Sequence, residues 1–185
     1  MLHNTELSWG TPAKLLHWAV AALVFVQIAL GWAAVTWRLS PTKLDLFVFH
    51  KSIGMLILVL MLTRVAWRAV NTAPSLPADM RALERRTAHA SHLLLYLLLL
   101  LMPVTGWIVT SAADIPFRIF WLIPLPAIVA PDKEMADAAA RVHLLLFVAL
   151  SLLLTLHIGA ALRHHFLKHD DVLARMLPGS SESAR

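Results

Sequence analysis

The chain has 185 residues, of which 59% are apolar and only 15% are charged, and its mean hydropathy is +0.70. This composition excludes an ordinary soluble globular domain and indicates an integral membrane protein. The formal net charge of +5 comes without an arginine-rich arm, which argues against nucleic-acid binding, and the lack of cysteine excludes disulfides, iron–sulfur clusters and thiol catalysis.

The first two hydrophobic segments are each long enough to cross the hydrocarbon core of a bilayer. They predict helices over about residues 13–37 and 43–68. A cap residue followed by proline marks the start of each one, at Thr11–Pro12 and at Ser40–Pro41. The first apolar run is too long for the core of a signal peptide and follows no basic segment, so we expect it to be retained.

Two more hydrophobic segments follow a proline-containing linker at 71–79. They predict helices over about residues 80–110 and 134–166, with a short cytoplasmic tail at 167–185. Four spans of this length in a chain this short predict an all-α fold, an integral membrane four-helix bundle that forms a single domain over residues 1–185.

Basic residues near the helix ends indicate the orientation, because lysine and arginine accumulate on the cytoplasmic side of a membrane. One side of the bundle carries Arg64, Arg68, Arg81, Arg85, Arg86, Arg163, Lys168 and Arg175. The other side mixes basic residues with five acidic ones. We therefore expect both termini to be cytoplasmic and the positive charge to contact anionic lipid headgroups.

The fourth segment carries two histidines, His143 and His157, inside a run of apolar side chains. Fourteen residues at about 100° each return a helix to within about 40° of its starting direction, so both histidines lie on one face, about 21 Å apart in depth. By the same topology His17 lies at the inner depth of His157, and His50 lies at the outer depth of His143. Two such pairs are what two bis-imidazole haems in a four-helix bundle require.

Other interpretations of these histidines remain open on spacing alone. A single histidine in a membrane helix often only hydrogen-bonds a neighbouring helix. A proton relay or a divalent-metal carrier would also use imidazoles, although a carrier would normally have acidic partners within the spans, and the sequence places none there. No catalytic triad, phosphate-binding loop or nucleotide fingerprint is visible, which leaves hydrolysis and phosphoryl transfer without machinery.

Five stretches spread along the chain carry a resemblance to a known family. They are LLHW at 15–18, FHKSIGMLILVLMLTRVAWR at 49–68, AHASHLLLYLLLLLMPVTGW at 88–107, RVHLLLFVALSLLLTLHIGAALRHHF at 141–166 and LARMLP at 173–178. Together they resemble the bacterial cytochrome b561 family, which is related to the haem-b subunits of nickel hydrogenases and formate dehydrogenases. The resemblance implies a multi-pass protein of the bacterial inner membrane that binds two haem b groups, with His17, His50, His143 and His157 as axial ligands of the iron.

Four further residues have expected roles near these cofactors. The family pattern places His92 close to the quinone or next to an axial ligand of the haem. The alternative is that His92 replaces His17 as a ligand. His164 either anchors the helix at the interface or, as the family's inner quinone site implies, gives a proton to reduced quinone. Arg64 and Arg68 either snorkel to the membrane surface or pair with haem propionates.

The resemblance is greatest to stand-alone members of the family, of which one branch oxidises superoxide and reduces ubiquinone. We expect superoxide, a small anion, to be attracted to the basic residues of the outer side and to pass its electron inward to ubiquinone. These residues are Arg38, Lys43, Lys51, Arg118, Lys133 and Arg141. A cytochrome b subunit that relays electrons between a partner dehydrogenase or hydrogenase and quinone is the alternative, and a non-redox proton or metal carrier comes last.

Overall fold

Four long helices dominate the computed structural model, which describes residues 1–6, 8–77 and 80–178. They are α1 (Thr11–Thr36), α2 (Pro41–Val70), α3 (Ala82–Ala112) and α4 (Lys133–Arg163). Each is long and apolar enough to cross a membrane. The predicted all-α membrane bundle is confirmed, and each helix boundary lies within three residues of its predicted place.

The helix starts agree with the predicted signals in one case and differ in the other. Ser40 caps α2, since its hydroxyl accepts the N–H of Lys43 at 3.3 Å. The expectation that Thr11 caps α1 is wrong, because Thr11 is already helical and Gly10 precedes it as the cap. A Cβ at Gly10 would lie 2.6 Å from the carbonyl oxygen of Leu2, so the N-terminal segment crosses the start of α1 too closely for any side chain.

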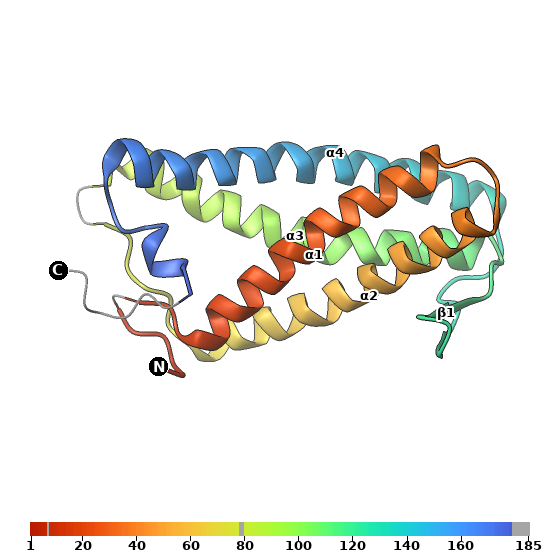
Figure 1. Ribbon diagram of the computed structural model, residues 1–185, viewed down its shortest axis with the longest axis horizontal. Helices are drawn as coiled ribbons and strands as arrows, with labels where there is room; N and C mark the ends of the chain where they lie inside the picture. The colour runs from red at the N-terminus through yellow and green to blue at the C-terminus, as the bar shows by residue number, and fades with distance from the viewer. Residues whose placement is uncertain (7, 78–79, 179–185) are drawn as a thin grey trace.

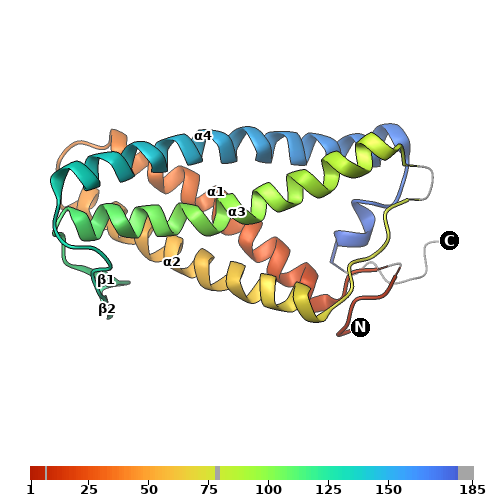
Figure 2. The ribbon, with the colours of Figure 1, turned by 180° about the vertical axis from the view of Figure 1, so that it is seen from behind.

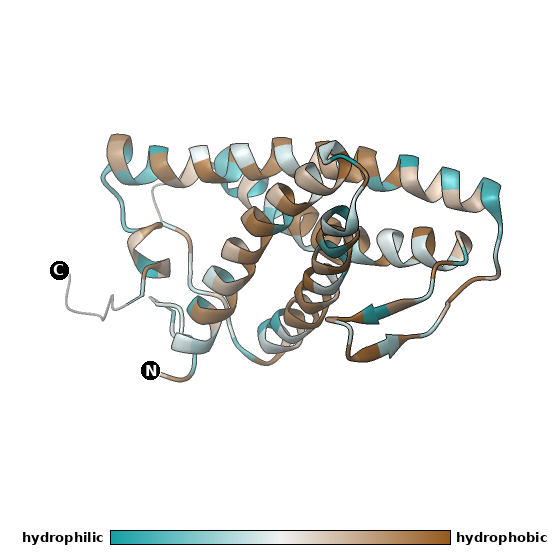
Figure 3. Cartoon of the chain, turned by 45° about the vertical axis from the view of Figure 1, so that its right-hand side comes forward, coloured by the Kyte–Doolittle hydropathy of each residue, from teal (hydrophilic) through white to brown (hydrophobic). Residues whose placement is uncertain are grey.

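The helices pack as two pairs, in which α1 lies along α2 and α3 lies along α4, while α2 and α3 join the pairs (Figures 1 and 2). The buried apolar cluster lies between α1 and α2 and consists of Val20, Val24, Ile57 and Met61. Many large apolar residues of the helices are exposed, and Figure 3 shows hydrophobic residues along the length of the helices. This distribution suits helices that face lipid on their outer sides.

A small β-hairpin lies at one end of the bundle, which we call the hairpin end (Figure 2). Its antiparallel strands are β1 (Phe117–Ile119) and β2 (Ile123–Leu125), both in the connection between α3 and α4. The turn is fixed to α2, because the N–H of Phe120 donates to the hydroxyl of the fully buried Ser52 at 2.8 Å. The sequence did not predict this hairpin.

The opposite end of the bundle, which we call the terminal end, gathers the N-terminal segment, the linker and the segment after α4 (Figure 1). That last segment forms a π-helical turn, η1 (His164–Lys168), and a 3₁₀ turn, η2 (Ala174–Met176), while residues 78–79 of the predicted linker and 179–185 of the predicted tail lie outside the described residues. An even number of spans brings both described ends of the chain to the terminal end. That this end is cytoplasmic stays a prediction.

Candidate functional site

One pair of histidines meets near the hairpin end. His50 of α2 and His143 of α4 have ring centres 6.3 Å apart, and their ring planes are inclined at 69°. The two ring planes are therefore steeply inclined, and neither ring is stacked on the other. Imidazoles from two different helices converge at one depth of the bundle, as the spacing of the sequence predicts.

Thr105 of α3 fixes the tautomer of His143. Its hydroxyl donates its one hydrogen to the carbonyl of Met102 at 2.8 Å, so it can only accept from His143 Nδ1, which lies 2.9 Å away. Nδ1 of His143 therefore carries the ring hydrogen, and Nε2 keeps its lone pair. That is the form of imidazole that binds a metal.

The other ring of this pair packs against the backbone of α1. A Cβ at Gly31 would lie 3.0 Å from Cε1 of His50 and 3.3 Å from its Nδ1, so any other residue there would require this ring to shift by a few tenths of an ångström. Gln27, one turn earlier, donates from its side-chain amide to the carbonyl of His50 at 2.7 Å. Nδ1 of His50 is buried and has no hydrogen-bond partner among the described residues.

Three histidines converge near the terminal end. His17 of α1 and His157 of α4 have ring centres 6.3 Å apart and ring planes at 72°, which nearly repeats the geometry of the first pair. His92 of α3 also approaches His157, with ring centres 5.5 Å apart and planes at 66°. The structure therefore brings together the predicted pair and adds a third imidazole at the same depth.

Arg64 of α2 holds His17 in the opposite tautomer from His143. Its Nη1 lies 2.9 Å from Nδ1 of His17, and its Nε donates to the hydroxyl of Tyr96 at 2.9 Å. A guanidinium group can only donate, so Nδ1 of His17 accepts and the ring hydrogen is on Nε2. If Nε2 of His17 binds a metal, the hydrogen must move to Nδ1 and Arg64 must release it.

Arg68 lies one turn after Arg64 on α2 and meets the same tyrosine. The guanidinium carbon of Arg64 lies 5.6 Å from the centre of the Tyr96 ring, and that of Arg68 lies 5.8 Å from it. Both distances are within the range of cation–π interactions. Tyr96 is the single tyrosine of the sequence. Arg64 is half-buried and Arg68 is exposed, and both lie close to Tyr96 on the neighbouring helix.

His164, at the start of η1, is partnered by Asp170. The distance from its Nδ1 to Oδ2 of Asp170 is 2.5 Å, and both side chains are mostly buried. Sequence reasoning missed Asp170, because helical periodicity does not apply across the chain reversal that joins the two residues. Other missed residues left a weak signal in the sequence, since a lone polar or glycine residue interrupts an apolar span at Gly31, Tyr96 and Thr105.

The basic residues of the hairpin end differ in how they are engaged. Lys51, next to His50 in the chain, has its Nζ 5.5 Å from the centre of the Phe117 ring of the hairpin. Lys133, by contrast, forms an ion pair with Asp137 at 2.8 Å on the exposed start of α4. Among the basic residues of the hairpin end, Lys51 is therefore the one that directly follows a paired histidine, His50.

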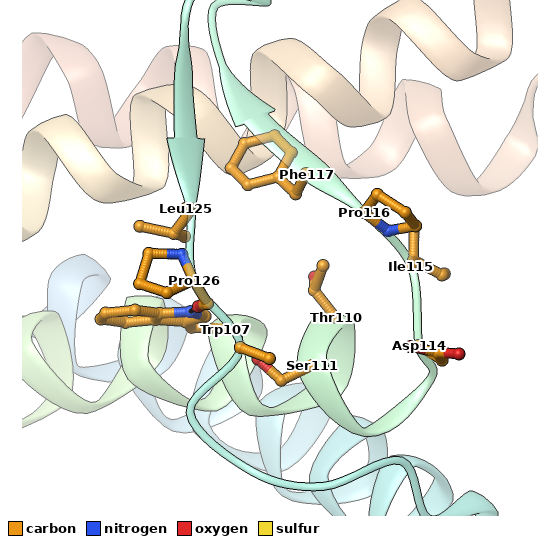
Figure 4. Close-up of a pocket in the computed structure, with 10 residues that line it drawn as sticks. Trp107, Thr110, Ser111, Asp114, Ile115, Pro116, Phe117, Leu125 and Pro126 are labelled. Carbon is orange, nitrogen blue, oxygen red and sulfur yellow. Dashed lines mark hydrogen bonds between the residues drawn. The ribbon is translucent and has the colours of Figure 1, made fainter.

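A pocket lies beneath the hairpin, between its strands and the end of α3 (Figure 4). Trp107, Thr110, Ser111, Phe117 and Leu125 are among the residues that line it, and none of the paired histidines does. Trp107 closes one side by donating its indole N–H to the carbonyl of Pro126 at 2.8 Å. The pocket is therefore separate from both histidine sites.

Within residues 1–6, 8–77 and 80–178, no three His, Asp or Glu side chains come close enough to hold a metal ion between them. Each of the two histidine pairs instead places two imidazoles from different helices close together. Such a set suits the iron of a haem, which already has four ligands from its own ring.

Comparison with known proteins gives consistent similarities. The family model described as prokaryotic cytochrome b561 matches residues 8–179. Cytochrome b561 homolog 2 of Escherichia coli (strain K12) is 34% identical over 184 residues, covering 96% of this chain and 95% of the relative. A probable superoxide oxidase CybB of Yersinia pestis is 30% identical, covering 88% and 92%, and cytochrome b562 of Cereibacter sphaeroides is 29% identical, covering 88% and 90%.

Proposed function

Since this chain belongs to the prokaryotic cytochrome b561 family, whose members are b-type cytochromes that transfer electrons in the bacterial inner membrane, we propose that it binds two haems and oxidises superoxide with ubiquinone as the acceptor. In this reaction two superoxide anions become two molecules of oxygen, and one ubiquinone takes up two electrons and two protons to become ubiquinol. The observation that carries the proposal is the near-identical geometry of two histidine pairs at the two ends of one bundle.

The residues present fit a haem at each pair. Two imidazoles bound on opposite sides of one iron, each through a nitrogen at about 2 Å, have ring centres roughly 6 Å apart. The separation is 6.3 Å both for His17 with His157 and for His50 with His143. The closer 5.5 Å approach of His92 to His157 is too short for that arrangement and favours His17 as the ligand.

When bound at these pairs, haem supplies reversible one-electron exchange, and the chain supplies position, orientation and proton access. α4 sets the two depths, since His143 and His157 are fourteen residues apart on one face. Thr105 keeps Nε2 of His143 free for the iron. Arg64 and Arg68 are the residues that would pair with haem propionates, because a carboxylate inside a membrane needs a cationic partner and Arg64 would be free to do so if His17 held the iron.

The Gly31 contact provides a test of the hairpin-end site. We expect Gly31→Ala to change the absorbance or midpoint potential of one haem and leave the other unchanged, because the added methyl group would push the ring of His50 from its position. The matched control is Gly159→Ala in α4, where a Cβ meets nothing within 4 Å. An equal change in both variants, or no change in either, would contradict the assignment of His50 to this site.

The proposed donor, superoxide, rests on the name of the Yersinia pestis relative and on the basic residues at the hairpin end. We expect reduction of the protein by superoxide to slow as ionic strength rises, because the Debye length falls from about 30 Å at 0.01 M to about 10 Å at 0.1 M. Neutralising Lys51 or Arg141 should lower the rate without loss of haem. The measurement is superoxide consumption coupled to ubiquinone reduction in liposomes.

Lys133→Gln is the control for that experiment, because it removes the same charge from a residue already paired with Asp137. It should slow the reaction less than Lys51→Gln does. The proposal would be contradicted if superoxide reduced this protein no faster than it reduces unrelated b haems. Fast reduction by a partner dehydrogenase would then favour an electron-relay subunit.

At the terminal end we place the quinone site near His92 and His164. His92 packs beside His157, at the level of the proposed terminal-end haem, and His164 directly follows α4, closer to the terminal end. Reduction of quinone consumes protons, and an imidazole is the side chain best suited to deliver them near neutral pH.

A further inference from the structure

The chain reverses direction directly after α4 and carries a carboxylate back to His164. Helix α4 ends at Arg163, η1 forms one π-helical turn, and His169 takes the left-handed conformation with φ 53°. The N–H of Asp170 then donates to the carbonyl of His164 at 3.2 Å, and Oδ2 of Asp170 lies 2.5 Å from Nδ1 of His164. Oδ1 of the same carboxylate accepts the N–H of Val172 at 3.2 Å. Both oxygens of Asp170 are therefore held in place.

His164 directly follows α4 and continues the face of that helix that carries His143 and His157. Seven residues separate it from His157, which returns the helix to within about 20° of the same direction, with a rise of about 10 Å toward the terminal end. Its side chain is only 12% exposed, and that of Asp170 is 21% exposed. The imidazole therefore lies between the terminal-end histidines and the water beyond the bundle.

The reversed segment is a fixed part of the structure. The indole N–H of Trp18, next to His17 in α1, donates to the carbonyl of Met176 at 2.8 Å. Arg175 donates to the carbonyl of Ser75 in the linker at 2.9 Å. These bonds tie the segment to two other parts of the terminal end, so Asp170 approaches His164 in a defined position.

We propose that Asp170 is a positioning residue for His164, which delivers protons to the quinone as it is reduced; this inference rests on the proposed function. The carboxylate accepts the Nδ1 hydrogen, which leaves Nε2 as the atom that exchanges protons. In each transfer the Nε2–H bond breaks and an O–H bond forms on the quinone, while water restores the proton to Nε2. The two electrons come from the two superoxide anions of the overall reaction.

The test compares three variants of the full-length holoprotein. Asp170→Asn removes the charge and keeps the shape, Asp170→Glu keeps the charge, and Asp171→Asn removes a neighbouring charge that pairs with Arg175 and does not touch His164. We expect Asp170→Asn to lower kcat for ubiquinol formation about tenfold to a hundredfold, with little change in KM for quinone or in haem content. Asp170→Glu should recover part of the loss, and Asp171→Asn should resemble the wild type.

A second readout does not depend on turnover. ¹⁵N NMR of histidine-labelled, reduced protein at alkaline pH should show His164 with its hydrogen on Nδ1 in the wild type and a shift toward Nε2 in Asp170→Asn, with assignment from His164→Gln. Equal kcat in Asp170→Asn and Asp171→Asn, or an unchanged tautomer, would overturn the inference. A wild type that forms no ubiquinol would instead overturn the proposed function, while the tautomer would still decide the pairing of the two residues.

Discussion

The His50→Ala and His143→Ala proteins are each expected to purify with one haem per chain, where the wild type carries two. The two imidazoles come from different helices and face each other across one site, so loss of either removes one of the two bonds by which the chain would hold the iron. The measurement is the haem-to-protein ratio together with a reduced-minus-oxidised spectrum, in which one component should disappear.

Thr105→Val is the matched control for the hairpin-end site. It keeps both histidines and the approximate shape of the side chain but removes the hydroxyl that accepts from Nδ1 of His143. We expect both haems to be retained and the properties of one to change, because the orientation of a ligand depends on the partner of its second nitrogen. Acid-acetone should extract all the pigment, since the chain has no cysteine to bind haem covalently. A wild-type ratio near one would contradict the two-site assignment.

The second large effect concerns the terminal-end site, where three histidines compete for two ligand positions. We expect His17→Ala and His157→Ala each to remove the other haem and to leave the hairpin-end component intact. His92→Ala should keep both haems, because its ring lies only 5.5 Å from that of His157 while His17 repeats the 6.3 Å separation of the other pair. Difference spectra of the three variants, recorded with equal protein, decide the assignment.

Two further outcomes of that comparison carry information. If His92→Ala removes the same spectral component as His157→Ala while His17→Ala does not, His92 is the ligand and the pair has been misassigned. Arg64→Gln keeps all three histidines and removes the guanidinium group beside His17. It should retain the haem and change its midpoint potential, since a half-buried cation near the site is lost.

Much of the fold follows from the sequence because the signals that define a membrane helix are local. A span is recognised by about twenty consecutive apolar residues, and Ser40 caps α2 through a contact three residues away. The depths of His143 and His157 follow from the rise of a single helix. The sequence alone therefore determined four spans, their approximate ends and the depth-matched pairs of histidines.

Tertiary structure decided which side chains meet each pair. The helices are apolar on nearly every side, so no polar stripe in the sequence tells which face of α1 or α3 turns inward. The rotation of each helix depends on its packing against the others. Only that packing brings Thr105 to His143, Gly31 to His50, and Arg64 with Tyr96 to His17.

Connections between helices were the least determined by sequence. The hairpin depends on the contact of Phe120 with Ser52, 68 positions earlier in the chain. Asp170 reaches His164 because η1 and the left-handed His169 turn the chain back on itself. Neither contact has a sequence period, because each forms where regular backbone hydrogen bonding ends and its geometry is set by the elements packed around it.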